Sequence, residues 1–233
     1  MNQIAQHLFQ VKERIAQAAE RASRNLQQIR LLAVSKTKPV EAIMAAHAAG
    51  QRCFGESYAQ EAASKIDTLR QQPEYSDIEW HFIGPLQSNK SKLVAERFDW
   101  VQSVDRDKLI DRLNNQRPTT MAPLNVCLQI NISGESSKSG TSEQEIFRLA
   151  ELVSHCDRLV LRGLMAIPEH TSDESVLAAQ MTRMQTLFTE LARQYPTVDT
   201  LSMGMTEDLE LAIAHGSTMV RVGTAIFGAR DYS

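Results

Sequence analysis

Eight short apolar runs recur along the chain, and each is separated from the next by a segment long enough for a helix. Several runs are apolar at successive positions, as in 126–128, and many of their residues are β-branched. Continuous apolarity is typical of strands buried on both faces, as in a parallel sheet covered by helices. The eight predicted strands are 31–35, 52–56, 80–84, 100–104, 125–132, 160–167, 200–204 and 219–223.

The segments between these runs carry helix signals. Pro39 stands at the predicted first turn of one segment, and Gly50 closes it. Thr206 precedes another segment, which Gly216 closes. Before the first strand, apolar residues recur at spacings of three and four, which predicts an amphipathic helix. These residues are Ile4, Leu8, Val11, Ile15, Ala18 and Ala22.

Alternating strands and helices within 233 residues match a closed barrel of βα units, whose typical size is about 250 residues. We therefore predict an α/β fold: a single (β/α)8 TIM-type barrel with an additional N-terminal helix, forming one domain over 1–233. No Pro/Ser-rich linker or shift in composition divides the chain. An open, doubly wound parallel sheet is the alternative that the same alternation permits.

Charge and cysteine content narrow the class of partner. The formal net charge is −3 at pH 7, which lacks the basic footprint of a nucleic-acid or anionic-membrane surface. The three cysteines are an odd number without C-x-x-C spacing, so they cannot all pair within the chain. The first residues reach Lys12 without an apolar run that would suit a signal peptide or a membrane span. We therefore expect a cytoplasmic protein whose partner is a small molecule.

Lys36 follows the first predicted strand, at the end where barrels of this kind carry their active groups. An amine that is partly desolvated there becomes nucleophilic toward an aldehyde, so Lys36 could form a Schiff base. The alternative is an ordinary solvated lysine. Lys38 is a competitor, although its place before Pro39 suggests a loop that caps a helix.

Phosphate often binds after the last two strands of such a barrel, where this chain has Ser202 and Gly204, then Gly223 and Thr224. Glycines let the backbone approach an oxyanion, and the two hydroxyls can donate hydrogen bonds. The same residues could instead form ordinary turns and caps. Glu207 and Asp208 count against an anion site, because we place them in the first turn of the next helix.

Two further polar residues lie within predicted strands. Arg221 is costly to desolvate in an apolar strand unless something accepts its hydrogen bonds, so a ligand or a structural ion pair is expected beside it. His81 could touch a ligand or be a core residue with satisfied hydrogen bonds. No metal site is expected, because no ligand cluster accompanies His81 in the sequence. The polar loops 84–92 and 133–140 could close over the barrel mouth or remain solvated.

Several motifs resemble the pyridoxal phosphate (PLP) homeostasis protein family, relatives of the N-terminal barrel of alanine racemase. The resemblance covers nearly the whole chain through 32–39, 54–58, 80–90, 163–168, 201–206 and 220–228. It implies that Lys36 binds PLP covalently and that Arg221 faces the pyridine nitrogen. It also implies a phosphate site at Ser202, Gly204, Gly223 and Thr224, with Met165 and Met205 lining the cofactor. One departure is Ser57, where the family usually has asparagine, which puts the contact made by that amide in doubt.

The resemblance suggests a carrier more than a racemase. Arginine stays protonated, so at the pyridine nitrogen it donates a hydrogen bond and makes the ring a weaker electron sink. Racemases of this fold add a tyrosine from a further domain, for which a chain ending at 231–233 leaves no room. We therefore expect PLP homeostasis without efficient catalysis, in a monomer that makes at most transient contact with PLP-dependent apoenzymes. A slow PLP-dependent racemase or lyase and a Schiff-base aldolase without cofactor are the alternatives.

Overall fold

The strands of the computed structural model, which describes residues 3–135, 139–169 and 171–229, form a closed barrel in chain order. All neighbouring strands pair in parallel, and β1 closes the ring against β8 through the pair Leu32 and Arg221. This closure confirms the predicted barrel and excludes the open sheet. The strands are β1 Arg30–Val34, β2 Cys53–Glu56, β3 Glu79–Phe82, β4 Trp100–Val104, β5 Leu124–Ile130, β6 Leu159–Ala166, β7 Thr200–Ser202 and β8 Met219–Val222.

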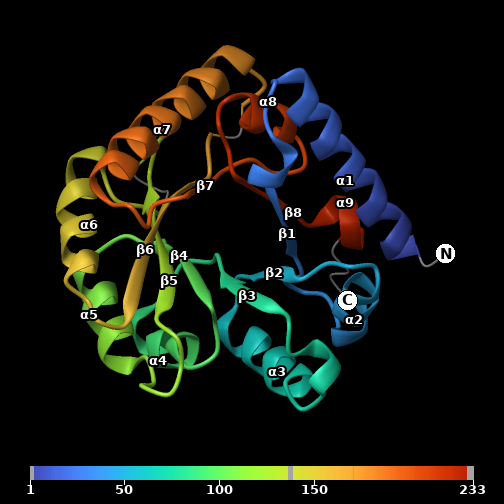
Figure 1. Ribbon diagram of the computed structural model, residues 1–233, viewed down its shortest axis with the longest axis horizontal. Helices are drawn as coiled ribbons and strands as arrows, with labels where there is room; N and C mark the ends of the chain where they lie inside the picture. The colour runs from blue at the N-terminus through green and yellow to red at the C-terminus, as the bar shows by residue number, and fades with distance from the viewer. Residues whose placement is uncertain (1–2, 136–138, 170, 230–233) are drawn as a thin grey trace.

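Helices surround the ring of strands (Figure 1). The α-helices are α1 Gln3–Arg21, α2 Val40–Ala48, α3 Ala59–Leu69, α4 Ser91–Ala95, α5 Asp107–Gln116, α6 Ile146–Ser154, α7 Glu174–Gln194, α8 Leu209–Ala214 and α9 Thr224–Phe227. Short 3-10 helices lie at Leu26–Gln28, Pro73–Tyr75, Ser88–Lys90 and Glu143–Glu145. None of the helices in the described part of the chain is long and apolar enough to cross a membrane.

The predicted N-terminal helix is confirmed as α1, which packs against α8 and α9. Its apolar stripe is buried, with Leu8, Val11 and Ile15 nearly inaccessible to solvent. Arg14 adds a polar link, because it donates hydrogen bonds to Glu210 on α8 and to the carbonyl of Thr206. The helix therefore supports the loop between β7 and α8 from outside the barrel.

Strand boundaries differ from the predicted ones by one or two residues. Strands β1 and β3 begin one residue earlier, at the polar residues Arg30 and Glu79, which a search for apolar runs misses. Strands β5 and β6 begin one residue earlier at leucines, and β2 begins one residue later. Several strands also end earlier than predicted, and beyond β7 the backbone turns at Gly204 with φ of 94°. Such a conformation favours glycine.

One helix start was predicted wrongly. Helix α8 begins at Leu209, so Glu207 and Asp208 lie in the preceding turn and not in its first turn. Asp208 accepts a hydrogen bond from the amide of Met205, 2.6 Å away. The carboxylate of Asp208 therefore stabilises its own loop. Because neither acidic residue lies in the first turn of α8, the predicted competition between a first-turn carboxylate and a bound anion does not arise.

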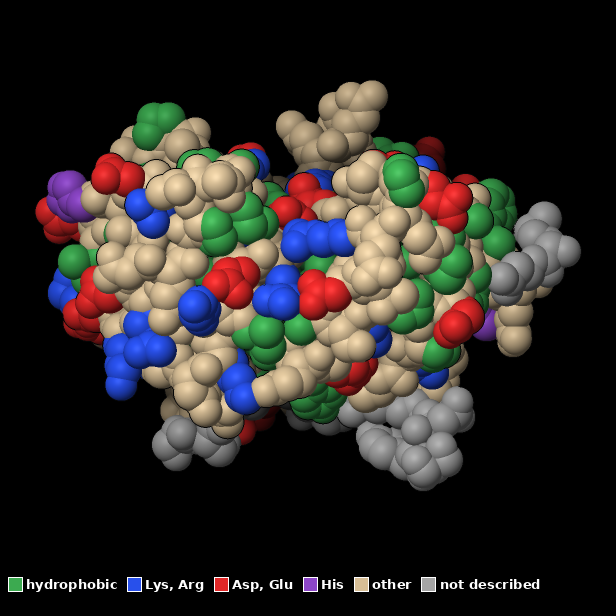
Figure 2. Space-filling view, turned by 90° about the horizontal axis from the view of Figure 1, so that it is seen from below, with side chains coloured by type: hydrophobic (Ala, Val, Ile, Leu, Met, Phe, Trp, Pro, Cys, Tyr) green, Lys and Arg blue, Asp and Glu red, His purple; other side chains and the backbone are tan. Residues whose placement is uncertain are grey.

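The surface shows no segregation of charge on the face seen in Figure 2, where Lys and Arg side chains alternate with Asp and Glu. Small apolar areas are scattered between them. This pattern agrees with the net charge of −3 and gives that face no basic stripe of the kind that tracks a phosphate backbone.

Candidate functional site

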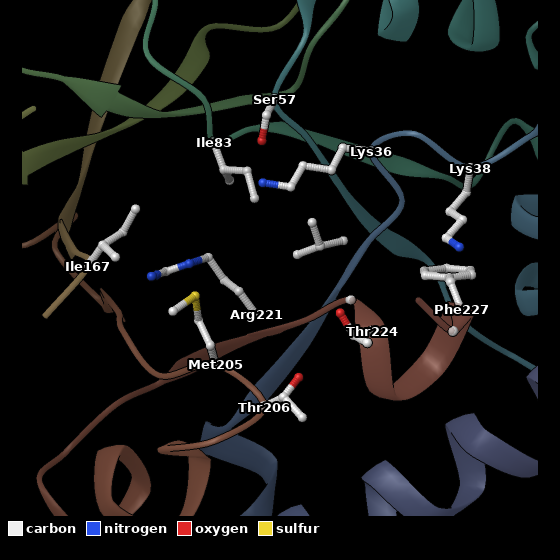
Figure 3. A pocket seen from close by; sticks show the side chains of 13 residues that line it. Lys36, Lys38, Ser57, Ile83, Ile167, Met205, Thr206, Arg221, Thr224 and Phe227 are labelled. Carbon is white, nitrogen blue, oxygen red and sulfur yellow. The ribbon is translucent and has the colours of Figure 1, made fainter. Parts of the chain in front are cut away.

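A cavity opens at the carboxyl ends of the strands, where β1 and β8 meet (Figure 3). Residues from the ends of six strands (β1, β2, β3, β6, β7 and β8) and from the loops that follow them form its wall. The described lining residues are Val34, Lys36, Lys38, Ser57, Ile83, Ile167, Met205, Thr206, Arg221, Gly223, Thr224, Phe227 and Gly228. The structure thus brings together five of the predicted site residues: Lys36, Met205, Arg221, Gly223 and Thr224.

Lys36 lies two residues beyond the end of β1 and projects into this cavity (Figure 3). The preceding residue, Ser35, is held by a buried ion pair: its hydroxyl donates to Glu56, and Lys65 donates to its carbonyl at 2.9 Å. Thr37 then turns the chain with φ of 64°. These contacts position the backbone at Lys36, whose partly buried side chain extends across the mouth in Figure 3.

Arg221 enters the cavity from β8 and is 4% exposed. Its Nη1 donates to the hydroxyl of Ser202 at 2.8 Å, and its Nη2 donates to the carbonyl of Ala166 at 2.9 Å. Burial lowers the pKa of Arg221 to about 10, and the nearby Asp208 carboxylate offsets part of this effect. Both of these hydrogen-bond partners are uncharged, so an anionic ligand in the cavity would stabilise the cation.

Gly223, Thr224 and Thr206 form the part of the wall beside Arg221. In Figure 3 the hydroxyls of Thr206 and Thr224 lie near each other, across the cavity from Lys36. A Cβ at Gly223 would lie 3.1 Å from the carbonyl oxygen of Val34, so glycine at this position allows the end of β8 to approach β1 closely. Hydroxyls and accessible backbone next to a buried guanidinium suit a phosphate group.

Three predicted site residues do not reach the wall. Met165 is fully buried and packs with Trp100 and Cys127 inside the barrel. The hydroxyl of Ser202 donates to Gln102 at 2.6 Å, and this donation replaces the one that we expected toward an anion. Gly204 faces outward, because its missing Cβ would lie 2.4 Å from the Cβ of Ala212 on α8. Strand alternation and helix packing, which the motif alone does not show, direct these groups away from the cavity.

Other lining residues were missed from the sequence. Ile83, Ile167 and Phe227 read as core positions, and only their places at strand and helix ends could have pointed to the mouth. Ser57 is noticeable in sequence only as a departure from the family, yet its hydroxyl is directed into the cavity near Lys36 (Figure 3). A Cβ at Gly84 would lie 2.2 Å from the carbonyl oxygen of Ser57. Glycine at 84 therefore allows the two loops to meet.

The structure describes the two loops that we expected could close the mouth to different extents. Within 84–92, residues Ser88–Lys90 form a 3-10 helix and Ser91 begins α4, so half of this loop is helical and packs against α5, where Ser91 donates to Gln116. The loop 133–140 includes 136–138, which lie outside the described residues.

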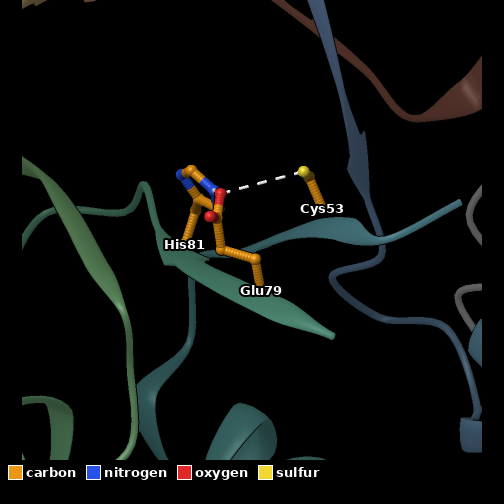
Figure 4. Close-up of side chains that lie close together, drawn as sticks. All are labelled: Cys53, Glu79 and His81. Carbon is orange, nitrogen blue, oxygen red and sulfur yellow. Dashed lines mark hydrogen bonds and ion pairs between the residues drawn. The ribbon is translucent and has the colours of Figure 1, made fainter. Parts of the chain in front are cut away.

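A second polar cluster lies at the opposite, amino-terminal end of the barrel. Ligand atoms of Cys53, Glu79 and His81 come within 4.8 Å of one another (Figure 4). However, Nη2 of Arg30 is 2.8 Å from the sulfur and 2.5 Å from Oε1 of Glu79. This cation already takes the central place, so we assign no metal there. The sequence did not reveal the cluster, because Cys53 lies on β2, Glu79 and His81 lie on β3, and Arg30 comes from β1.

Ion pairing sets the charge state at this end. Burial would raise the pKa of Glu79, but the hydrogen bond from His81 and the charge of Arg30 outweigh it and lower that pKa to about 2. Burial also lowers the pKa of His81, against the opposing effect of Glu79. A neutral His81 donating to a carboxylate is therefore the state that the geometry favours.

Comparison with known proteins identifies the family to which this barrel belongs. The family described as "Alanine racemase, N-terminal domain" matches residues 7–231. Relatives of this chain include a protein of Escherichia coli K12, which is 55% identical to it over 233 residues, and a protein of Vibrio alginolyticus, which is 52% identical to it over 233 residues. Both alignments cover at least 99% of each chain, and both relatives are called pyridoxal phosphate homeostasis protein. The chain therefore belongs to the pyridoxal phosphate homeostasis protein family.

A solved structure supports the same placement. PipY of Synechococcus elongatus PCC7942, described with PLP bound, is 35% identical and matches with a TM-score of 0.82. The match covers 97% of this chain and 100% of PipY. The barrel and the chain length are thus shared with a protein that was observed with PLP.

Proposed function

We propose that this protein binds PLP covalently through Lys36 and holds it for intracellular homeostasis without efficient catalysis. The observation that carries the proposal is convergence: the amine of Lys36, the guanidinium of Arg221 and the cradle at Gly223 and Thr224 line one cavity. An aldehyde that carries a phosphate ester matches both parts of this wall. Bound PLP supplies the aldehyde that an amine can capture and a conjugated ring that absorbs visible light.

Different residues of the site would contact different parts of PLP. Thr206, Gly223 and Thr224 would hold the phosphate, Arg221 the ring nitrogen, and Met205 one face of the ring. Met165 and Ser202 would act from behind the wall, where Met165 fills the barrel and Ser202 orients Arg221, while Gly204 allows close packing against α8. Ser57 would meet the ligand near Lys36 in place of an asparagine. The negative charge of the phosphate would offset the buried charge of Arg221.

Weak catalysis is supported by the lining residues. The described residues of the wall include two lysines, Lys36 and Lys38, but no histidine, tyrosine, aspartate or glutamate. Of the two lysines, Lys38 donates through Nζ to the carbonyl of Ala229. Proton transfer to and from a substrate carbon needs a positioned acid or base. A protonated arginine at the ring nitrogen would also weaken the ring as an electron sink.

The names of the relatives support the same proposal, since proteins more than half identical over the full length are called pyridoxal phosphate homeostasis proteins. We further propose that residues 1–233 act as one unit, as a monomer, in the cytoplasm. The three unpaired cysteines favour a reducing compartment. Contacts with PLP-dependent apoenzymes would be transient and would serve delivery of the cofactor.

The decisive experiment is a titration of the purified protein with PLP, followed by visible absorption and by assays of amino-acid turnover. We expect a saturable visible band and turnover well below about 1 s⁻¹, the lower edge of ordinary enzyme rates. Turnover above that rate on any amino acid would favour a racemase or lyase. A protein that stays colourless with PLP would favour the aldolase alternative.

A further inference from the structure

A chain of buried hydrogen bonds runs through the barrel from the cofactor cavity to its opposite end. At the cavity, Nη1 of Arg221 lies 2.8 Å from Oγ of Ser202, which lies 2.6 Å from Oε1 of Gln102. Nε2 of Gln102 is 2.9 Å from Nδ1 of His81, and Nε2 of His81 is 2.6 Å from Oε1 of Glu79. Five side chains from four strands therefore connect the two ends.

The direction of donation along this chain is determined by its members. The guanidinium of Arg221 can only donate, so the oxygen of Ser202 accepts, and its own hydrogen goes to Gln102. Because Oε1 of Gln102 accepts from Ser202, Nε2 of Gln102 lies on the other side, where it donates to Nδ1 of His81 and to the sulfur of Met219. Nδ1 of His81 then carries no proton, and Nε2 donates to Glu79. Every bond points from Arg221 toward the carboxylate.

Burial makes this arrangement rigid. Ser202, Gln102 and His81 are each 0% exposed, so bulk water does not reach them, and an unmade bond would cost the full desolvation of the group. The ring of His81 also stacks on Trp100, with centroids 5.0 Å apart and planes at 16°. Beyond Glu79, Arg30 closes the chain with an ion pair. One set of orientations satisfies all of these groups together.

We propose that Gln102 and His81 are positioning residues, which act through Ser202 to hold the guanidinium of Arg221 in one orientation toward the cofactor. The ion pair of Glu79 and Arg30 anchors the chain at the far end of the barrel. The effect of this orientation on the cofactor rests on the proposed function. The claim that Gln102 and His81 orient Arg221 in the cofactor-free protein does not depend on the proposed function.

The first test uses the cofactor-free protein. Nitrogen-15 NMR of His81 should show the neutral ring with its proton on Nε2, and a crystal structure of Gln102→Met should show Arg221 released from its position against Ser202. A doubly protonated His81 at neutral pH, a proton on Nδ1, or an unmoved Arg221 in the variant would overturn the proposal. The NMR experiment needs no variant, so it decides even if Gln102→Met fails to fold.

The second test uses PLP binding. Gln102→Met should weaken PLP binding by about tenfold and shift the visible band and its pH profile, because the donor at the ring is no longer aligned. The matched control is Gln129→Met, since Gln129 is also a buried glutamine of the barrel but lies outside the chain of bonds. The control should keep the affinity and the band of the wild type.

The outcomes separate the two proposals. If Gln102→Met keeps the wild-type affinity, band position and pH profile, or if Gln129→Met changes them equally, the positioning role is wrong while the proposed function stands. If the wild-type protein itself develops no visible band with PLP, the proposed function fails. In that case the His81 tautomer and the Arg221 orientation still decide whether the chain of bonds is correct.

Discussion

The two ends of the barrel interior both carry charged side chains, but they balance those charges differently. At the amino-terminal end, Arg30 contacts both Glu79 and Cys53, and His81 donates to the same carboxylate. At the carboxyl end, the buried guanidinium of Arg221 donates to a hydroxyl and a carbonyl, and the carboxylate of Asp208 acts on it at longer range. The first cluster is complete in itself, whereas the second leaves room for a ligand charge.

This difference shows that a gathering of polar side chains does not by itself mark a binding site. Cys53, Glu79 and His81 have the residue types of a metal site, yet Arg30 donates to Cys53 and Glu79, and His81 donates to Glu79. The mouth has a less familiar set, but its cation and its open cradle at Gly223 and Thr224 suit an anionic ligand. The balance of charge within the protein distinguishes a structural cluster from a ligand site.

The largest expected effect is at the mouth. Lys36→Ala should abolish the visible band of PLP bound to the protein, because the covalent attachment is lost. Absorption spectra of the variant at saturating PLP measure this. Lys38→Ala provides the comparison for the neighbouring lysine. A Lys36→Ala variant that keeps the band at wild-type intensity, or a band lost only in Lys38→Ala, would show that the covalent lysine is assigned wrongly.

Arg221→Met tests whether the buried charge serves the ligand or the fold. We expect PLP binding to weaken roughly 10- to 100-fold, as for loss of a hydrogen bond to a charged group. The free energy of unfolding of the cofactor-free protein should change by less than about 1 kcal/mol, because removal of a desolvated charge offsets the lost bonds. Equilibrium unfolding in denaturant measures the second quantity. A large loss of stability with unchanged affinity would make Arg221 a structural residue.

Thr224→Val examines the phosphate cradle with little change of shape. Loss of one hydroxyl donor should weaken PLP binding by about tenfold. The matched control is Thr186→Val on α7, whose hydroxyl bonds only within its own helix. Isothermal titration of both variants with PLP measures the difference. Equal affinities would mean that the phosphate does not contact Thr224.

Glu79→Gln probes the opposite end and should give the smallest effect. The pKa of Glu79 is about 2 in the fold against an ordinary value of 4.5. Its ionised form therefore stabilises the fold above about pH 4.5, and this contribution is lost as the pH falls toward 2. Because the side chain is about one-third exposed, we expect only about 1 kcal/mol.

Stability curves from pH 7 to pH 2 check this expectation. The variant should lose less stability on acidification than the wild type, and Glu13→Gln at an exposed position of α1 should follow the wild type. Parallel curves for all three proteins would mean that the Glu79 ion pair does not contribute to folding. Weakened PLP binding in Glu79→Gln would instead agree with transmission through His81 and Gln102.

Much of the fold could be predicted from the sequence, because strand and helix periodicities are local properties. The apolar runs located all eight strands of the barrel, and the spacing of three and four located α1. The starts of β1 and β3 were missed, since Arg30 and Glu79 are polar there for reasons that involve other strands. The start of α8 was missed because Asp208 contacts its own loop before the helix begins.

The sequence alone determined the barrel, its N-terminal helix and the placement of Lys36, Arg221, Gly223 and Thr224 at strand ends, because order along the chain controls which end of a parallel strand each residue follows. Only the tertiary structure decided which of those side chains share a cavity. It turned Ser202 toward Gln102 and buried Met165 beside Trp100. It also brought Cys53, Glu79 and His81 around Arg30. These outcomes depend on strand register and on pairing between distant segments, which local sequence does not specify.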